Sequence, residues 1–163
     1  MNDKPLYYGD KLTYQLGAGF LADCKTVEDW GTGGGAFKTF RPDAIGVDGS
    51  KTPFADKTAD LQKYVSNCEG VFMRHILEHN YNWQKILTNA IKSASKKICI
   101  VFFIPLSQSE TKEIAFNKIG VPDLSISESE FNIILHKNKV TAYTTEHATN
   151  TQYSFEKIFY IKK

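Results

Sequence analysis

Apolar positions recur along the chain with two different spacings, and the spacing changes from segment to segment. Between residues 82 and 95 they lie three and four residues apart, which predicts one buried face of an amphipathic helix. Residues 98–104 are continuously apolar, as in a strand covered on both faces. Residues 139–146 and 154–161 are further strand-like runs, and the turn-prone residues 148–150 between them predict an antiparallel hairpin.

Glycine and proline cut the first half of the chain into short elements. The predicted strands there span residues 27–30, 44–47, 58–60 and 70–73. A short helix is expected from Ala36 and must end near Pro42, because proline cannot continue a helix. Another helix is predicted after Ser127, since Ser127 and Glu130 have the capping-box spacing. Strands that alternate with helices predict an α/β sandwich with a mostly parallel sheet.

Composition and charge narrow the possible functions. The 163 residues fit one domain, so we expect residues 1–163 to form a single domain without a separate substrate domain. The net charge of +2 gives no strong field, which argues against a nucleic-acid patch or a membrane surface as partner. No apolar run reaches the roughly 20 residues of a membrane span. The three cysteines have no disulfide or zinc spacing, so a cytoplasmic location is expected.

A glycine cluster follows the first predicted strand and opens the short helix. Such a turn lets the backbone approach a ligand closely and directs helix N–H groups toward it. Asp48 ends the second predicted strand, 19 residues after Asp29, where a carboxylate can accept both hydroxyls of a ribose. Gly31, Gly33 and Ala36 also match the dinucleotide fingerprint, so a nicotinamide oxidoreductase is an alternative.

Three segments together resemble one enzyme family. The run Val27–Gly35 has two strand positions, an acid and then Gly-x-Gly-x-Gly, and Met73–His79 contains Leu-Glu-His after a strand. These segments resemble the first motif and the post-strand-four segment of class I S-adenosylmethionine-dependent methyltransferases, in the branch often called type 11. The closing hairpin resembles the sixth and seventh strands of that family. The resemblance implies a three-layer Rossmann-like sandwich, with a mostly parallel seven-stranded sheet and a C-terminal antiparallel hairpin.

The resemblance also implies which residues hold S-adenosyl-L-methionine. Asp29 would lie near the methionine amino group. Gly31, Thr32 and Gly33 would pack under the methionine part and the ribose, and Gly35 completes the glycine motif. These five residues are expected to form the methionine side of the cofactor site.

The nucleoside side of the site follows from the next two strand ends. Asp48 would hold the ribose hydroxyls, and Gly49 and Ser50 in the same turn are expected to bind the cofactor as well. Asp60 matches the acid that meets the adenine amino group in the family, and Leu61 would offer its backbone N–H.

Arg74 and His75 follow the fourth predicted strand. Arg74 lies where backbone groups usually touch the methionine portion, and His75 is the candidate catalytic base, with an unperturbed pKa near 6.5. His75, Glu78 and His79 would share a face if a helix began at His75, which leaves a divalent-metal site and a purely structural role open. We expect no metal site and assign catalysis to His75.

The expected function is methyl transfer from S-adenosylmethionine to an unidentified acceptor, a small molecule or a glycan. A binding module that keeps the cofactor pocket without catalysis is a further alternative. The N-terminal segment and the stretch between Pro105 and Ser127 are the segments available to shape an acceptor pocket. Tyr14 and Gln15, on an expected N-terminal helix, are candidates to cover the cofactor, with packing on the core as the alternative. The oligomeric state is not predicted.

Overall fold

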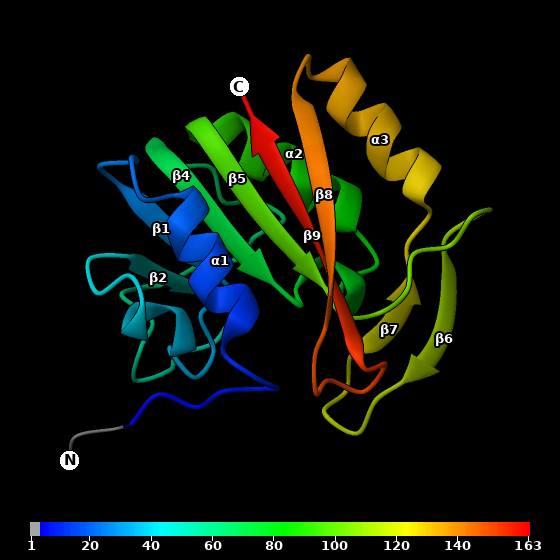
Figure 1. Cartoon of the computed structure of the whole chain (residues 1–163), viewed down its shortest axis with the longest axis horizontal. Coiled ribbons are helices and arrows are strands. Elements are labelled where there is room, and N and C mark those ends of the chain that lie inside the picture. The colour runs from blue at the N-terminus through cyan, green and yellow to red at the C-terminus, as the bar shows by residue number, and fades with distance from the viewer. Residues whose placement is uncertain (1–3) are drawn as a thin grey trace.

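The computed structural model describes residues 4–163. One sheet runs through the middle of this region (Figure 1). Its strands are β1 (Val27–Trp30), β2 (Ile45–Asp48), β3 (Lys57–Thr58), β4 (Cys68–Arg74), β5 (Ala94–Phe102), β8 (Thr141–Ala148) and β9 (Phe155–Lys162). Their order is β3-β2-β1-β4-β5-β9-β8, with β9 antiparallel to both of its neighbours and the other pairs parallel. The predicted seven-stranded, mostly parallel sheet with a C-terminal hairpin is confirmed.

Helices cover both faces of the sheet and make the three layers that were predicted. The helical elements are α1 (Leu12–Phe20), α2 (Trp83–Ser93), α3 (Glu128–Lys137) and the 3-10 turns η1 (Ala36–Thr39) and η2 (Leu77–His79). In Figure 1, α1 lies in front of the sheet and α2 behind it. The predicted cap of α3 is present, because the Ser127 hydroxyl accepts a hydrogen bond from the Glu130 N–H at 3.3 Å.

Side chains of β5 alternate between the two cores, which explains its continuous apolar run. Ile98, Ile100 and Phe102 pack on the α2 side, whereas Cys99 and Val101 pack on the α1 side. Successive strand residues point to opposite faces, so both sets must be apolar when both faces are covered. The apolar face predicted for residues 82–95 is likewise buried against the sheet in α2.

Two local features differ from what the sequence indicated. The helix expected after the glycine cluster is only the single 3-10 turn η1, since little chain remains between Gly35 and Pro42. A second sheet, the hairpin of β6 (Lys112–Phe116) and β7 (Pro122–Ser125), was not predicted. Every residue of β6 is exposed, so no apolar alternation marked it in the sequence.

Two further features bear on the environment of the protein. Cys24, Cys68 and Cys99 are all free and buried. Within residues 4–163, no helix combines the length and the apolar character that crossing a membrane would require.

Candidate functional site

The C-terminal ends of the parallel strands meet at one edge of the sheet, where two cavities adjoin. The first has a volume of about 560 Å³ and the second about 470 Å³, both within the roughly 300–1,000 Å³ of small-molecule sites. Gly31, directly after β1, and Ile76, after β4, line both cavities. Open α/β sheets bind their ligands at this edge.

The second cavity gathers the residues that were predicted for the nucleoside. Asp48, Gly49 and Ser50 from the end of β2 line it together with Asp60 and Leu61, which follow β3. The two carboxylate oxygens of Asp48 accept hydrogen bonds from the backbone N–H groups of Gly33 and Ser50, each at 2.9 Å. An ionised carboxylate has about four acceptor positions, so Asp48 can bind two hydroxyls as well. Asp48 therefore holds the glycine loop beside the second cavity through its hydrogen bond to Gly33.

The glycine loop lines the first cavity, and its glycines serve different purposes. Gly33 has φ +46°, and a Cβ there would have no neighbour nearer than the Gly31 carbonyl oxygen at 3.8 Å. A Cβ on Gly31 would instead lie 1.9 Å from Ile76 Cδ1, and one on Gly35 would lie 2.3 Å from the Phe54 ring. Thr32 and Gly33 are thus at the cavity wall as expected, whereas Gly35 packs against Phe54 and lines neither cavity.

Asp29 is buried behind this loop. One of its carboxylate oxygens accepts a hydrogen bond from the Thr32 hydroxyl at 2.8 Å, and Thr32 lines the first cavity. Burial raises the pKa of Asp29 to about 7, opposed by the Thr32 hydrogen bond. A carboxyl group held in this way would be stabilised in its charged form by a cation bound in the cavity.

Arg74 lines the first cavity but is fully engaged by the protein. Its guanidinium donates to the Thr13 hydroxyl at 3.0 Å, the Tyr14 hydroxyl at 2.8 Å and the Tyr8 carbonyl at 2.8 Å. It also forms an ion pair with buried Glu156, at 2.7 Å. Arg74 therefore fixes α1 and the N-terminal segment to the strand ends.

Glu156 is the important residue that the sequence analysis missed. It lies at the start of β9, which runs antiparallel to β5 and so begins at the edge where the other strands end. Its side chain is completely buried and accepts a hydrogen bond from Thr13 at 3.2 Å. The His75 Nε2 atom lies 2.6 Å from Glu156 Oε1. The sequence signal for a buried Glu156 was that it is the one acidic residue in the apolar run 155–161. Its partner His75 lies 81 positions away, so the pairing could not be predicted from the sequence.

The backbone at His75 directs this side chain into the site. Its N–H donates to the Val101 carbonyl at 2.9 Å, and the chain then turns through φ +58°, a left-handed conformation that histidine adopts more readily than most residues. With Glu156 as acceptor, His75 carries its proton on Nε2, which leaves Nδ1 as a hydrogen-bond acceptor. Among residues 4–163, no group donates to Nδ1, and this atom is not sealed from solvent.

Burial, the Arg74 cation and His79 hold the pKa of His75 well below 6.5. The expectation of an unperturbed imidazole with a pKa near 6.5 is therefore wrong. Burial also raises the pKa of Glu156, while the Arg74 guanidinium favours its carboxylate form. Both the burial of His75 and the Arg74 cation therefore favour the neutral imidazole over the imidazolium.

His75, Glu78 and His79 do not share a helical face, because η2 begins only at Leu77. The buried Glu78 carboxyl accepts the Phe103 N–H at 3.1 Å, and burial raises the pKa of Glu78 to about 8. His79 Nδ1 bonds the Pro122 carbonyl at 2.9 Å and lies 3.2 Å from Asp123. The three side chains have separate partners, and residues 4–163 contain no cluster of three or more metal-ligating groups.

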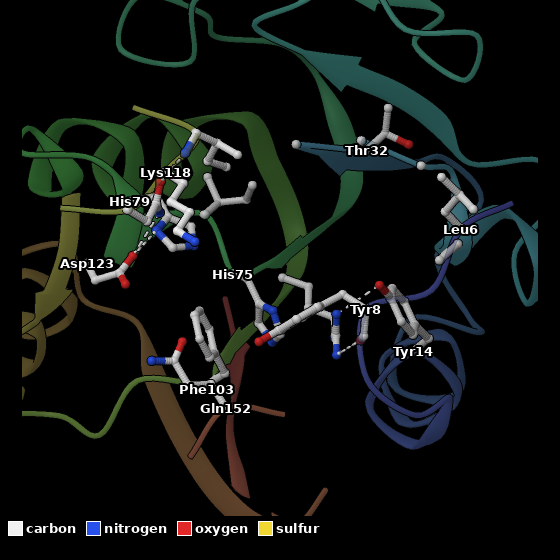
Figure 2. Close-up of a pocket in the computed structure, with 18 residues that line it drawn as sticks. Leu6, Tyr8, Tyr14, Thr32, His75, His79, Phe103, Lys118, Asp123 and Gln152 are labelled. Atoms are coloured by element: carbon white, nitrogen blue, oxygen red, sulfur yellow. Dashed lines mark hydrogen bonds and ion pairs between the residues drawn. The ribbon is translucent and has the colours of Figure 1, made fainter. Parts of the chain in front are cut away.

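Two segments form the outer wall of the first cavity. Leu6 and Tyr8 come from the N-terminal segment, which a Leu6 N–H to Gly34 carbonyl bond of 3.0 Å fastens to the glycine loop. Lys118 and Ile119 come from the turn of the unpredicted hairpin. Figure 2 shows Lys118, His79 and Asp123 on one side and Leu6 and Tyr14 on the other, with His75 and Phe103 between them. Gln15 and residues 105–108 line neither cavity.

Comparison with known proteins identifies similar structures only. No protein-family model and no curated protein sequence matches the chain. A magnesium protoporphyrin IX methyltransferase from Synechocystis PCC 6803, solved with bound S-adenosylhomocysteine, is 14% identical with a TM-score of 0.65, over 94% of this chain and 83% of that chain.

Two other solved structures are similar in the same way. The 1,6-didemethyltoxoflavin-N1-methyltransferase from Burkholderia thailandensis is 13% identical with a TM-score of 0.71, over 94% of this chain and 77% of that one. An S-adenosylmethionine-dependent methyltransferase from Mesorhizobium loti is 11% identical with a TM-score of 0.61, over 85% and 90% of the two chains. At these identities the likeness establishes a shared fold.

Proposed function

We propose that this chain is an S-adenosylmethionine-dependent methyltransferase that acts on a hydroxyl group of a small molecule. The observation that carries the proposal is the junction of two cavities at one sheet edge. Asp48 and Asp60 line one cavity, and the open glycine loop and His75, which is paired with buried Glu156, line the other. The similar solved methyltransferases support the same function, and Leu77-Glu78-His79 supports the type 11 branch.

The residues present fit this cofactor. The cavity beside Gly33 is space that any side chain at that position would fill, and Asp48 has acceptor capacity left for a ribose. The buried Asp29 carboxyl, behind Thr32, would stabilise the methionine ammonium through its charge. Asp60 and Leu61 would meet the adenine edge. Gly35 would act only by allowing the loop to turn beside Phe54.

When bound, S-adenosylmethionine supplies a methyl group on a sulfonium that a nucleophile can displace in line. His75 would accept the hydroxyl proton of the acceptor at Nδ1 and so make the acceptor oxygen a better nucleophile toward that methyl group. Glu156 holds the required tautomer by accepting the hydrogen bond from Nε2. Arg74 and Thr13 keep Glu156 in place. Positioning supplies much of the remaining catalysis.

A methyl-transfer assay with matched histidine variants tests this function. S-adenosylhomocysteine formation is measured with a mixture of small hydroxylated acceptors for the unmodified protein, His75→Asn and His136→Asn. Asparagine tolerates the left-handed backbone at position 75 but cannot take up a proton. His136 lies exposed in the last turn of α3 and is the control.

We expect His75→Asn to lower turnover by about 10²- to 10⁴-fold, the usual contribution of a general base, and His136→Asn to leave it unchanged. Because burial lowers the pKa of His75, the turnover of the unmodified protein at saturating S-adenosylmethionine, where protonation of Asp29 no longer limits cofactor binding, should persist as the pH falls through 6.5. No S-adenosylhomocysteine above background with any acceptor would favour the non-catalytic binding module instead. Loss of activity centred at or above pH 6.5 would contradict a buried catalytic imidazole.

A further inference from the structure

The outer half of the first cavity bears on the identity of the methyl acceptor, and the argument rests on the proposed function. An aromatic corner lies around the candidate base. The Phe103 ring lies 4.5 Å from the His75 ring, and the Tyr8 ring meets both edge to face, at 5.5 Å from His75 and 5.7 Å from Phe103. Tyr8, His75 and Phe103 all line the first cavity, so a ring bound there could add a further contact of this kind.

Large apolar side chains at the cavity mouth are left uncovered. Leu6 is 74% exposed, Ile119 is 83% exposed and Tyr8 is 48% exposed, and all three line the same cavity. They come from the two segments that face each other across the mouth, the N-terminal segment and the β6–β7 turn. A bound apolar surface would remove them from water, which is favourable. A sugar would leave them without apolar partners and would need several paired polar groups instead.

Lys118 gives the same wall a free positive charge. It forms no ion pair and no side-chain hydrogen bond with any group in residues 4–163, although it lines the cavity. The Arg74 guanidinium there is paired with Glu156, and the Asp123 carboxylate is held by hydrogen bonds, from Asn117 at 3.0 Å and beside His79. A cationic sulfonium would add to the positive potential. Lys118 and the sulfonium are therefore the two positive groups that an anionic acceptor would meet in this cavity.

The size of the cavity limits the acceptor. Its volume of about 560 Å³ also has to hold the methionine part of the cofactor. The space beyond Gly33 and Thr32 suits a molecule of one or two rings. A hydroxyl of that molecule has to reach His75, which lies between the two sides of the cavity (Figure 2).

We propose that the methyl acceptor is a small aromatic hydroxy acid, with its ring in the Tyr8–Phe103 corner, its hydroxyl at His75 and its carboxylate toward Lys118. The hairpin turn that was unmarked in the sequence is then the part of the chain that selects the acceptor. Ile119 covers the ring, and Lys118 selects the charge.

Calorimetry in the presence of saturating S-adenosylhomocysteine tests the proposal. The probes are the three positional isomers of hydroxybenzoate, the three matched hydroxybenzamides, which keep ring and hydroxyl but lack the charge, and glucose. The proteins are the unmodified chain, Lys118→Met and Lys112→Met. Lys112 is an exposed lysine on β6 of the same hairpin and lines neither cavity, so it is the matched control.

At least one hydroxybenzoate should bind about two- to five-fold more tightly than its amide, the effect of one exposed ion pair. Lys118→Met should abolish that preference without changing the affinity for S-adenosylhomocysteine, whereas Lys112→Met should retain it. If S-adenosylhomocysteine binds but no hydroxybenzoate does at millimolar concentration, the acceptor proposal is overturned. Equal effects of the two lysine variants, or preferential binding of glucose, would overturn it too. If S-adenosylhomocysteine itself does not bind, the proposed function fails. This titration is carried out before any acceptor is added, so its result is distinguishable from a failure of the acceptor proposal.

Discussion

Replacing Asp29 by asparagine should make the protein more stable at high pH and weaken its binding of the cofactor. Asp29 is buried, and its pKa is raised from 3.8 to about 7. As the pH rises above 3.8, the unfolded chain loses this proton, while the folded chain retains it until about pH 7. The folded state then binds more protons than the unfolded state, so stability falls as the pH rises through this window.

The size of the effect follows from the same pKa. Each unit of pKa difference is worth about 1.4 kcal/mol, so the two units between pH 5 and pH 7 change the free energy of unfolding by about 3 kcal/mol. The asparagine side chain in the Asp29→Asn variant cannot ionise, and its amide oxygen can still accept the Thr32 hydrogen bond. Any cost of placing the new NH₂ group is the same at both pH values. The difference between the variant and the unmodified protein therefore isolates the charge of Asp29.

Urea unfolding at pH 5 and pH 8 measures this difference. The stability advantage of Asp29→Asn should grow by about 3 kcal/mol between the two pH values. Calorimetry on the same variant should show weaker binding of S-adenosylhomocysteine, because the negative charge of Asp29 that attracts the ligand's ammonium group is lost. If the difference in unfolding free energy between Asp29→Asn and the unmodified protein is equal at pH 5 and pH 8, the raised pKa of Asp29 is refuted. Unchanged affinity would refute its role toward the ligand.

Two further substitutions separate packing from binding. Valine is strained at the positive φ of both Gly33 and Gly31, but only at Gly31 would its Cβ also clash, 1.9 Å from Ile76 Cδ1. Gly33→Val should therefore lower the melting temperature less than Gly31→Val and lose S-adenosylhomocysteine binding, because its side chain enters the cavity. Normal binding by folded Gly33→Val would show that the cluster is only a turn. Glu78→Gln should gain about 3 kcal/mol in relative stability between pH 6 and pH 8, because the pKa of Glu78 is raised to about 8 and the folded state retains its proton over that interval. Urea unfolding at the two pH values checks this, and a constant difference would show that Glu78 ionises as it does in the unfolded chain.

Much of the site could be predicted because it lies where strands end. Asp48 and Asp60 each follow a predicted strand, and parallel strands bring their C-terminal ends to one edge. The sequence therefore placed these residues together without knowledge of any side-chain contact. The glycine loop was predictable for the same reason, although only the structure distinguishes the open position Gly33 from Gly35, which packs on Phe54.

The remaining features depend on contacts between distant segments. Glu156 comes to His75 only because β9 inserts antiparallel beside β5, and the neighbouring Lys157 gave no reason to expect that Glu156 would be buried. In the β6–β7 hairpin, all of β6 is exposed and leaves no apolar alternation in the sequence, although β7 buries Leu124 in the core. The prediction that His75, Glu78 and His79 could share a helical face was wrong. The hydrogen bonding of β4 to β5 continues to His75, and the chain turns only after this residue.

Calorimetric titration with S-adenosylhomocysteine and with NAD, on the unmodified protein and Asp48→Ala, tests the central claim most directly. We predict that S-adenosylhomocysteine binds and NAD does not. Asp48→Ala should weaken binding about ten- to several-hundred-fold, since hydrogen bonds to a charged group contribute about 1.5–3 kcal/mol each and 1.4 kcal/mol is tenfold. The Gly33 and Ser50 amides would also lose their acceptor. Tighter binding of NAD, or unchanged S-adenosylhomocysteine affinity in a folded Asp48→Ala variant, would contradict the account.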